Sequence, residues 1–519
     1  MQAMPVNEPP RAVLPPFEEF AKAHAAGAGV VWTQRTGDLE TPVSALLKLG
    51  ADQPGSLLLE SVQGGEYRGR YSIIGVKPDL VWRVRAGRAE ASRGGFGEAA
   101  FRPQRDGPLK SLRKLLARSA LKLPDALPPM AAGLFGYLGY DMVRLMETLP
   151  DKAPDPIGTP DAMLVRPTLI AVFDNVTSEI TLVTPARKRA NETALAAFDR
   201  ACARLQRASR ALDRPLPRRA EGRAHDIPAQ RSNTTPEAYR AIVEKCKAYA
   251  RAGDIFQVVP SQRFSTAFPL PPFALYRALR RLNPSPFLFF LNFADFALVG
   301  SSPEILVRLR DATVTIRPIA GTRPRGATPG EDLALEADLL GDPKERAEHL
   351  MLVDLARNDL GRVAKRGAPK GYNAAGAQPG SANVRVTEAF TIERYSHVMH
   401  IVSNVEGAIG EGKDALDALI AGFPHGTVTG APKIRAMEII NEVEPHKRGV
   451  YAGGVGYFGA GGDMDTCIAL RTGVIKAGML HVQAGGGVVL DSDPELELQE
   501  TLHKSRALFR AAAEAWRFV

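Results

Sequence analysis

Two pairs of glutamates, far apart in the chain, share one spacing. Glu345 and Glu348 stand three residues apart in the stretch 339–363, and Glu497 and Glu500 repeat that spacing near the C-terminus. Residues three apart on a helix share a face, so each pair would present two carboxylates together. Carboxylate oxygens suit Mg²⁺, which takes one or two of them and completes its shell with water and substrate oxygens. The two pairs therefore predict one magnesium ion held between two helices.

Each pair follows the same helix-start signal. An aspartate and a proline stand before the first pair at 342–343 and before the second at 493–494. An aspartate can cap the free N–H groups of a first turn, and proline fits the first helical position. Acids in a first turn are also stabilised by the helix dipole, which is the plainer interpretation of either helix taken alone. The repetition of both signals favours the shared cation.

Two glycine-rich segments could let a ligand approach the backbone. The segment 426–433, GTVTGAPK, leads into a predicted helix, so its free N–H groups and threonine hydroxyls could hold an anion. Its spacing is not that of a Walker A loop, and a capped loop without a ligand is the alternative. The segment 484–489 places three glycines in a predicted strand, which indicates either close approach of a ligand or another backbone, or a β-bulge.

Three single residues carry chemistry that a buried site could use. Glu304, which follows a Ser-Pro pair, could be a general acid or a loop carboxylate. His400, near the start of a predicted strand, could assist catalysis or form a hydrogen bond in the core. Arg471 falls in the predicted strand 465–476, among mostly apolar residues. A guanidinium in such surroundings needs an anionic partner, so Arg471 indicates an anionic ligand or side chain nearby.

The predicted elements indicate an α+β protein. Short apolar or alternating strands separated by glycine turns come in hairpin-like runs, and helices cluster between them. Besides the two acidic helices, helices are predicted at 193–212, 236–252, 414–421 and 433–443. Runs of this kind favour an antiparallel sheet over a doubly wound parallel one. We therefore expect a large antiparallel β-sandwich flanked by helices.

The chain is long enough for more than one hydrophobic core, because 519 residues exceed what a single core usually supports. Residues 1–16 are rich in proline and are expected to fray. We predict an N-terminal region, 17–212, and a C-terminal region, 236–519, joined by a linker at 213–235 that is rich in proline and arginine. A long surface loop inside one domain would explain the same composition. The segment 367–381 is predicted to be a flexible insertion.

The formal net charge of +9 raises the question of nucleic acid. The basic residues are scattered, and no zinc-finger, RNA-recognition or helix-turn-helix pattern is present. A basic enzyme with an anionic substrate explains the charge equally well. A non-catalytic nucleic-acid-binding protein is the rival class, but paired acidic helices argue against it because they would repel phosphates.

Other features of the sequence bear on where the protein works. No apolar run approaches the ~20 residues of a membrane helix, and no secretory signal is visible at the N-terminus. Three widely spaced cysteines have neither metal-binding nor redox spacing. We expect a cytoplasmic protein that binds neither nucleic acid nor membrane.

Several short motifs occur here in the order in which they occur in the chorismate-utilising enzymes. They are LLES at 58–61, GDIFQ at 253–257, NPSP at 283–286, the loop 318–326, LMLVDLARND at 350–359, GTVTGAPK at 426–433 and AGGGVVLD at 484–491. Together they cover most of the chain. The sequence is therefore identified as a member of this family, and it closely resembles the large subunits of anthranilate synthase.

This resemblance implies a fold, a reaction and a metal site. The fold would be that of anthranilate synthase, with residues 236–519 as the chorismate-binding catalytic region. The reaction would be the Mg²⁺-dependent conversion of chorismate and ammonia to anthranilate and pyruvate, the first step of tryptophan biosynthesis. Mg²⁺ would be bridged by Glu348 and Glu500, with Glu345 and Glu497 beside them, and would hold the ring carboxylate of chorismate.

The resemblance also implies roles around the ring of chorismate. Glu304 would protonate the departing 4-hydroxyl group, His400 would assist the elimination, and Thr429 would hydrogen-bond the substrate region. The substrate-binding positions would be Gly321, Thr322, Tyr451, Arg471, Gly485 and Gly487. Of these, Tyr451 and Arg471 would grip the enolpyruvyl carboxylate. Loss of hydroxide at neutral pH requires a proton donor, which agrees with the role implied for Glu304.

Position 320 discriminates within the family. Bacterial aminodeoxychorismate synthases carry Pro-Ile-Lys-Gly-Thr, in which the lysine attacks the ring, whereas this chain has Ala320 at that place. Alanine cannot attack, so free ammonia would be the nucleophile. This favours anthranilate synthase over the alternatives, which are 4-amino-4-deoxychorismate synthase component I and isochorismate or salicylate synthase.

The resemblance implies a protein partner and an inhibitor. The chain has no glutaminase signature, so ammonia would come from solution or from a glutamine amidotransferase subunit, anthranilate synthase component II, in a hetero-oligomer. Tryptophan would be a feedback inhibitor, bound at Glu60, Ser61, Pro286, Phe287 and Leu288. Phe287 and Leu288 replace the commoner Tyr-Met at this pocket. Inhibition by tryptophan is still expected, and the replacement bears on the affinity for tryptophan.

Overall fold

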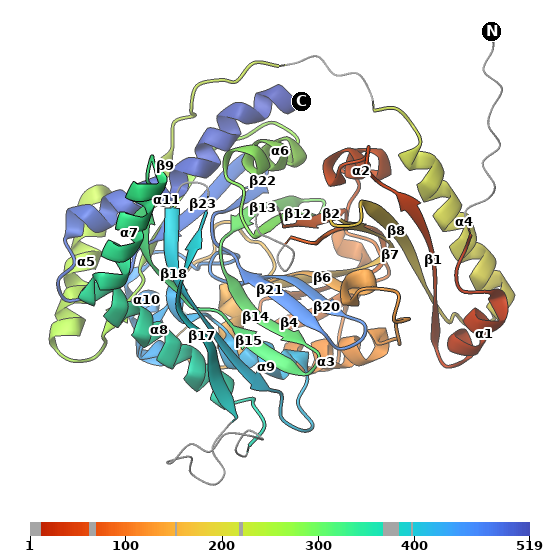
Figure 1. The fold of residues 1–519 in the computed structure, drawn as a ribbon, viewed down its shortest axis with the longest axis horizontal. Helices are drawn as coiled ribbons and strands as arrows, with labels where there is room; N and C mark the ends of the chain where they lie inside the picture. The colour runs from red at the N-terminus through yellow and green to blue at the C-terminus, as the bar shows by residue number, and fades with distance from the viewer. Residues whose placement is uncertain (1–11, 62–68, 151–152, 217–221, 367–382, 396–397) are drawn as a thin grey trace.

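The computed structural model describes residues 12–61, 69–150, 153–216, 222–366, 383–395 and 398–519. Every strand pair formed by these residues is antiparallel. The strands build two layers, and helices cover the outside of both (Figure 1). The predicted α+β architecture, an antiparallel sandwich flanked by helices, is confirmed. The segment 367–381 lies outside the described residues.

The first layer is a single run of hydrogen-bonded strands. In spatial order it contains β1 (Ala28–Thr36), β8 (Glu179–Arg187), β7 (Ala162–Asp174), β3 (Tyr71–Arg85), β2 (Leu57–Glu60), β12 (Phe287–Asn292), β13 (Phe296–Ser302), β22 (Thr472–Lys476), β23 (Met479–Gly485), β11 (Ser261–Ala267) and β9 (Arg231–Ser232). The long strands β3 and β7 continue into the second layer. Their register is interrupted between Pro78 and Leu80, and such an irregularity lets a strand pair bend.

The second layer carries most of the residues expected to be catalytic. In spatial order it contains β5 (Arg102–Pro103), β4 (Arg88–Ser92), β3, β7, β6 (Gly133–Leu138), β20 (Gly454–Gly459), β21 (Met464–Ile468), β14 (Ile305–Arg310), β15 (Thr313–Ile316) and β18 (Val398–Ala408). Two further strands, β16 (Ile319–Pro324) and β17 (Val384–Arg394), pair with β18. A separate two-stranded sheet joins β10 (Gln257–Val258) to β19 (Gly430–Ala431).

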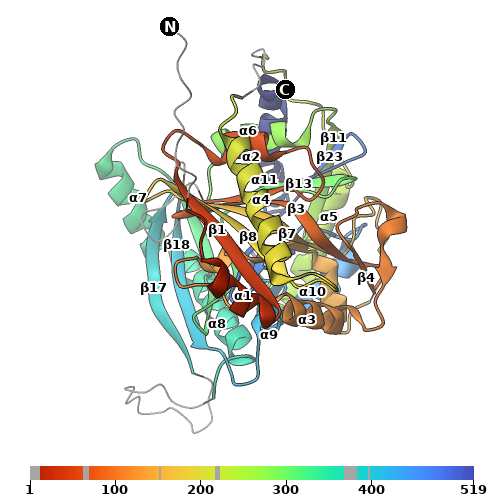
Figure 2. The same ribbon diagram turned by 90° about the vertical axis from the view of Figure 1, so that its right-hand side faces the viewer.

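Helices pack on both outer faces. The first layer is covered by α1 (Phe17–Ala25), α2 (Pro42–Leu49), α4 (Ala194–Leu212), α6 (Pro272–Leu282) and α11 (Pro494–Glu514), whose apolar residues share one cluster with its strands. The second is covered by α3 (Pro108–Ser119), α8 (Pro343–Gly361), α9 (Ala415–Gly422) and α10 (Lys433–Val443). Two more helices, α5 (Pro236–Arg251) and α7 (Pro329–Gly341), pack beside α11 and beside β16. Figure 2 shows α4 lying along β1 and β8.

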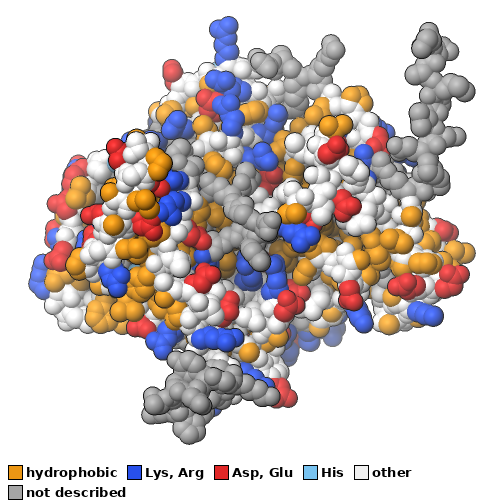
Figure 3. Space-filling view, in the orientation of Figure 1, with side chains coloured by type: hydrophobic (Ala, Val, Ile, Leu, Met, Phe, Trp, Pro, Cys, Tyr) orange, Lys and Arg blue, Asp and Glu red, His pale blue; other side chains and the backbone are white. Residues whose placement is uncertain are grey.

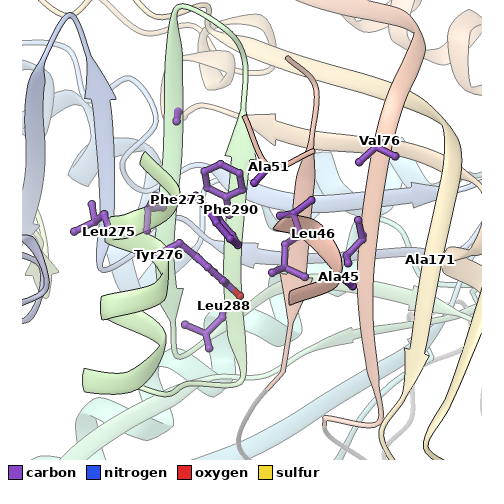
Figure 4. Close-up of a cluster of buried hydrophobic side chains, with 14 of the residues drawn as sticks. Ala45, Leu46, Ala51, Val76, Ala171, Phe273, Leu275, Tyr276, Leu288 and Phe290 are labelled. Atoms are coloured by element: carbon purple, nitrogen blue, oxygen red, sulfur yellow. The ribbon is translucent and has the colours of Figure 1, made fainter. Parts of the chain in front are cut away.

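Side-chain alternation divides the core. On β12, Leu288 and Phe290 face the helices, where Figure 4 shows them beside Phe273 and Tyr276 of α6. Their neighbours Phe289 and Leu291 belong instead to the cluster between the two layers. This is the period-two pattern of a strand buried on both faces.

Strand pairing crosses the predicted boundary between the two regions. In the first layer β2 pairs with β12, and in the second β6 pairs with β20. Within 213–235, the strand β9 pairs with β11. The N-terminal and C-terminal regions therefore share both layers, while their division at 213–235 stays a prediction. None of the helices described is long and apolar enough to cross a membrane.

Both acidic helices begin where the sequence predicted. The Asp342 carboxylate accepts hydrogen bonds from the backbone N–H groups of Lys344 and Glu345, and α8 starts at Pro343. The Asp493 carboxylate caps α11 in the same way.

The prediction of one strand over 465–476 was wrong. The structure has β21 and β22, which are separated by a turn at Arg471. Arg471 has φ of 47°, in the left-handed region that a non-glycine residue seldom adopts. A continuous strand cannot pass through that conformation. Residues held in this way cluster at functional sites, which makes Arg471 a stronger candidate than its apolar neighbours suggested.

Candidate functional site

The two glutamate pairs approach one glycine segment. A Cβ on Gly486 would lie 2.7 Å from Glu497 Oε2 and 3.2 Å from Glu500 Oε2. A Cβ on the next residue, Gly487, would lie 2.5 Å from Gln257 Nε2, and that amide donates to Glu348 Oε1 at 3.0 Å. Two carboxylates of α11, those of Glu497 and Glu500, thus lie against this segment, and Glu348 of α8 is linked to it through Gln257. The glycines leave room for these side chains, which explains three glycines in succession.

The acids in each pair crowd one another. Burial is the largest cause that raises the pKa of Glu497 to about 7, against a hydrogen bond from Ser492 that lowers it and together with the neighbouring Glu500, which also raises it. Burial and then the charge of Glu348 raise the pKa of Glu345. Among the described residues, Glu497 Oε2 is a buried oxygen without a hydrogen-bond partner. Each pair is therefore an acidic site that a cation would stabilise.

The glutamate oxygens suit a magnesium ion whose shell is completed by water and substrate better than a metal ion enclosed by protein side chains. Within the described ranges, no group of three or more His, Cys, Asp and Glu side chains lies close enough to hold a metal. Glu500 contacts Lys504 Nζ at 2.6 Å, and Glu345 contacts Arg323 at 3.6 Å. Mg²⁺ often binds one or two carboxylates together with water and substrate, so the hard oxygens present here suit it. The four glutamates as its ligands stay a prediction.

Glu304 is a buried acid, and in the part of the chain that the structure describes no cation lies at hydrogen-bonding distance from its carboxyl. Its side chain is 3% exposed, and its Oε1 accepts from the Thr427 hydroxyl at 2.9 Å. Burial raises the pKa of Glu304 to about 8, although Thr427 and the Ile319 backbone act to lower it. The Nδ1 atom of His425 lies 3.6 Å away, and burial lowers the pKa of that ring to about 3, so His425 is neutral. Glu304 consequently carries a proton at neutral pH and can donate it.

His400 is held as a neutral imidazole with one defined tautomer. Its Nδ1 lies 2.9 Å from the carbonyl oxygen of Gly321 and 3.1 Å from the hydroxyl of Thr322. A carbonyl can only accept, so Nδ1 carries the proton and Nε2 keeps its lone pair. Burial lowers the pKa of His400, the Gly321 contact raises it, and the charge of Arg471 lowers it again. His400 can therefore accept a proton through Nε2.

Arg471 and Tyr451 provide a desolvated cation and a buried hydroxyl. Burial lowers the pKa of Arg471, whose charge acts on His400. Burial raises the pKa of Tyr451 to about 12, and its hydroxyl contacts the backbone of Gly485. Its ring lies 5.4 Å from the guanidinium carbon of Arg448. A desolvated guanidinium whose charge reaches a neutral histidine is suited to an anionic substrate.

The other predicted site residues are placed as follows. Gly321 has φ of 68°, and a Cβ there would lie 3.1 Å from Glu345 Oε2, so it links His400 to the first acid pair. Thr429 is fully buried, and its hydroxyl donates to the His425 carbonyl inside the loop 426–433. The threonine that contacts an acid is Thr427. The role predicted for Thr429 toward the substrate stays a prediction.

Four residues at the site were not singled out from the sequence. They are Gln257, His425, Thr427 and Lys504. Gln257 ends the motif 253–257, and Thr427 lies in the motif 426–433, so both stand in segments that carried the resemblance. Lys504 follows Glu500 by four residues on α11, and its ammonium donates to the Gly485 carbonyl at 3.0 Å and lowers the pKa of Glu304. Its helical spacing from Glu500 was the available signal.

The residues predicted to bind tryptophan line one cavity of about 340 Å³. It is bounded by segments of both layers, and its walls include Glu60, Ser61, Pro286, Phe287, Leu288, Val455, Tyr457 and Cys467. Glu60 is buried and accepts two hydrogen bonds from Arg280, at 2.8 and 3.0 Å. Figure 4 shows Tyr276, whose hydroxyl also donates to Glu60, among the apolar side chains behind this wall. The structure thus brings these five residues together.

The surface seen in Figure 3 mixes both signs of charge. Lysine and arginine side chains stand beside aspartates and glutamates across this face. Many of the arginines of the molecule are bound in ion pairs, such as Arg323 with Asp338 and Arg113 with Asp417. A face of mixed charge lacks the continuous basic stripe on which nucleic-acid binding depends.

Comparisons with known proteins agree with this geometry. The model of a family described as chorismate binding enzyme matches residues 70–510. The chain is 58% identical to anthranilate synthase component 1 of Cereibacter sphaeroides, over 97% of this chain and 98% of that one. It is 50% identical to anthranilate synthase component 1 of Pseudomonas aeruginosa, over 96% of this chain and 98% of that one.

Solved structures show the same fold. Anthranilate synthase component I from Streptococcus pneumoniae superposes with a TM-score of 0.74 at 34% identity, covering 91% of this chain and 98% of that one. The menaquinone-specific isochorismate synthase from Escherichia coli superposes with a TM-score of 0.68 over 94% of this chain and 95% of that one. Its identity is 18%, so this second likeness concerns the fold alone.

Proposed function

Since this chain belongs to the family of chorismate binding enzymes, we propose that it converts chorismate and ammonia to anthranilate, pyruvate and water, as the large subunit of an anthranilate synthase. In this reaction ammonia adds to C2 of the ring, the 4-hydroxyl group leaves as water, and pyruvate is then eliminated. The first stage needs a proton donor, and the elimination needs a proton acceptor.

The observation that carries the proposal is the protonated Glu304. Its pKa of about 8 leaves the carboxyl protonated at neutral pH, and Thr427 holds the carboxyl in place. A carboxylic acid in this state can deliver its proton to the departing hydroxyl group, which would otherwise leave as hydroxide. Burial is the main physical cause of this state, and it outweighs the hydrogen bonds to Glu304 and the charge of Lys504.

His400 and Arg471 complete the roles on the substrate side. His400 presents the lone pair of Nε2, because Nδ1 is bound to Gly321. It can therefore accept the proton that is lost when pyruvate is eliminated. Arg471 and Tyr451 are suited to bind the enolpyruvyl carboxylate, since a guanidinium and a hydroxyl both donate to anions.

Mg²⁺ is part of the proposal. Glu348 and Glu500 would hold it, with Glu345 and Glu497 beside them. When bound, the ion would neutralise and polarise the ring carboxylate of chorismate. The support comes from the crowding of each acid pair, the unpartnered Glu497 Oε2 and the hardness of the oxygen donors. The protein itself supplies the spacing of the pairs, through the glycines that leave room for them.

Ammonia is proposed as the nucleophile, delivered by a glutamine amidotransferase subunit in a hetero-oligomer in the cytoplasm. Ala320 on β16 stands next to Gly321, and a methyl group cannot attack a ring or activate water. A lysine at that position would be needed for attack by the protein. The relatives are named component 1, which agrees with the existence of a second component.

Tryptophan is proposed as a feedback inhibitor that binds in the 340 Å³ cavity. The cavity offers apolar and aromatic walls for an indole ring and a carboxylate, Glu60, for an ammonium group. Phe287 supplies an aromatic ring without a hydroxyl, so the affinity depends on packing at that wall.

One assay tests the reaction and the partner together. Purified protein is incubated with chorismate, Mg²⁺ and ammonium, and the fluorescence of anthranilate is followed. We expect anthranilate with ammonium, and none with glutamine until an amidotransferase subunit is added. Formation of aminodeoxychorismate, isochorismate or salicylate in place of anthranilate would reject the proposal.

A further inference from the structure

The 340 Å³ cavity and the catalytic acid are separated by a wall one residue thick. Pro303 and Ile305 line the cavity, whereas the carboxyl of Glu304 between them meets Thr427 on the other side. Ile319 also lines the cavity, and its backbone forms a hydrogen bond with Glu304. Any ligand that presses on this wall therefore presses on the peptide units that hold the acid.

Tyr395 contacts both sides of this wall. It lines the cavity, and its ring packs edge-on against His400, with 5.6 Å between ring centroids and 62° between ring planes. Its hydroxyl donates to Glu393 at 2.8 Å. The backbone N–H of Tyr395 donates to the Val398 carbonyl at 2.8 Å, which ties Tyr395 to the first residue of β18.

An ion pair fixes the hydroxyl end of Tyr395. Arg317 is buried and donates to Glu393 at 3.1 Å, while Glu393 accepts from the tyrosine hydroxyl. Arg317 itself lines the cavity. Glu393 on β17 stands opposite His400 in the strand register, and Thr322 on β16 stands opposite it on the other edge of β18. The anchor of Tyr395 and the imidazole thus sit at the same level of one three-stranded segment.

Among the described residues, the hydrogen bonds to the His400 ring reach only one of its atoms, Nδ1. Gly321 and Thr322 both meet Nδ1, which leaves the ring free to pivot about that atom. The edge of Tyr395 opposes such a pivot, since close packing leaves no room for it. Because only Nε2 is available to the substrate, a small pivot would move the proton acceptor out of reach.

We propose that Tyr395 is a positioning residue for His400 and that it transmits occupancy of the cavity to this histidine. A ligand in the cavity contacts the face of the Tyr395 ring or its Arg317–Glu393 anchor and changes the angle at which the ring meets the imidazole. This inference rests on the proposed function for the identity of the reaction and of the cavity ligand, which is tryptophan.

The first test separates positioning from general structure. Tyr395→Phe keeps the ring but removes the bond to Glu393, and Tyr395→Leu removes the ring. For Tyr395→Phe with ammonium as nitrogen source we expect kcat to fall about tenfold, less than the roughly hundredfold that a 1 Å misplacement can cost, with KM for chorismate within about twofold. For Tyr395→Leu we expect a larger fall in kcat, because the ring itself is removed. The double variant Tyr395→Phe/Glu393→Gln is expected to have nearly the same kcat as Tyr395→Phe, because both substitutions remove the same hydrogen bond between Tyr395 and Glu393.

Tyr249→Phe is the matched control. Tyr249 on α5 donates its hydroxyl to Glu442 of α10 at 2.8 Å, which is the length of the bond from Tyr395 to Glu393. Tyr249 is not among the residues that line the cavity. This variant is expected to keep the kcat, KM and inhibition of the wild type. An unchanged kcat in Tyr395→Phe, or an equal loss in Tyr249→Phe, would overturn the positioning role.

The second test separates binding from inhibition. Tryptophan binding is measured by calorimetry, and inhibition of the ammonium reaction is measured on the same preparations. In Tyr395→Phe we expect Kd to stay within about threefold while the concentration that halves activity rises at least tenfold, a coupling loss within the usual range for linked sites. Parallel changes in binding and inhibition, or no change in either, would overturn the transmission. Absence of tryptophan binding to the wild type would overturn the proposed inhibitor and the transmission, whereas the kcat comparison would still decide the positioning role.

Discussion

Two buried glutamates, Glu304 and Glu60, differ in what surrounds them. Both are nearly inaccessible, with 3% and 5% of the residue exposed. Glu60 accepts two hydrogen bonds from Arg280 and forms an ion pair with it. Glu304 meets a threonine hydroxyl, a backbone N–H and a neutral histidine. Among the described residues, Glu60 is therefore hydrogen-bonded to a cation and Glu304 is not.

This difference agrees with the proposed roles, a binding carboxylate for Glu60 and a catalytic acid for Glu304. Burial disfavours the charged form unless an opposite charge compensates, so burial raises the pKa of Glu304, whereas Glu60 is bound by the Arg280 guanidinium. The two lie on opposite sides of a shared wall formed by Pro303 and Ile305. The same residue type is thus proposed to donate a proton on one side of the wall and to contact a ligand on the other.

The largest expected effects come from neutralising Glu304 and Glu60 in turn, which tests whether the two acids differ in role. For Glu304→Gln we expect kcat to fall by about 10²–10⁴, the usual contribution of a general acid, with melting temperature little changed because the wild-type group is already neutral. For Glu60→Gln we expect turnover within about twofold but a loss of stability of up to about 3 kcal/mol, since Arg280 loses its partner. Steady-state kinetics and thermal denaturation of both variants check this. Equal effects of the two substitutions on kcat would remove the distinction.

Glu348 and Glu500 differ from both of these acids, because they are proposed to bind a metal cation. Glu348→Gln and Glu500→Gln are expected to abolish turnover while the fold stays intact, because the Mg²⁺ that they would share is lost. Glu495→Gln is the control, since Glu495 lies on the same helix but is exposed and paired with Arg240. Activity is measured across a series of Mg²⁺ concentrations, with circular dichroism as the check on folding. Activity of either variant at saturating Mg²⁺ would count heavily against these ligands.

On the cavity side of the wall, Ser61→Phe tests whether tryptophan binds next to Glu60. The larger side chain would fill part of the 340 Å³ space next to Glu60, so tryptophan inhibition should be relieved, with the half-inhibitory concentration rising at least about tenfold, or ~1.4 kcal/mol of binding. Turnover with ammonium should stay close to that of the wild type. An unchanged inhibition curve would remove this cavity as the tryptophan site.

The smallest expected effect is a pH dependence. Because burial raises the pKa of Glu304 from its usual value to about 8, the protonated form prevails below pH 8 and is lost above it. The kcat should therefore fall as pH rises through 8, by about tenfold per unit at higher pH. The residual activity of Glu304→Gln should lack this decline. A wild-type rate that stays constant up to pH 9.5 would contradict the assignment.

The sequence predicted the elements and the residue types better than their contacts. Hairpin-like runs predicted the antiparallel layers, and the repeated Asp-Pro signal placed the starts of α8 and α11 at the observed residues. These features are local, so spacing and caps determine them. Glu304, His400 and Arg471 were named, but the sequence alone could not show that burial keeps Glu304 protonated.

What the sequence could not supply depends on segments that meet only in the folded chain. The turn at Arg471 was predicted as a strand, because its apolar neighbours have the composition of one. Thr427 was passed over for Thr429, since which hydroxyl faces Glu304 depends on the geometry of the loop. Tyr395 carries no motif of its own, and its importance follows from a contact between β18 and a cavity on the other side of a wall.

The most direct test of the account is the protonation state of Glu304 itself. The difference in infrared absorption between the wild type and Glu304→Gln isolates the carboxyl of this residue, and it can be followed from pH 5 to 10. We predict the band of a protonated carboxyl at pH 7, replaced by that of a carboxylate with a midpoint at about pH 8. A carboxylate band already present at pH 6 would show that Glu304 cannot be the proton donor.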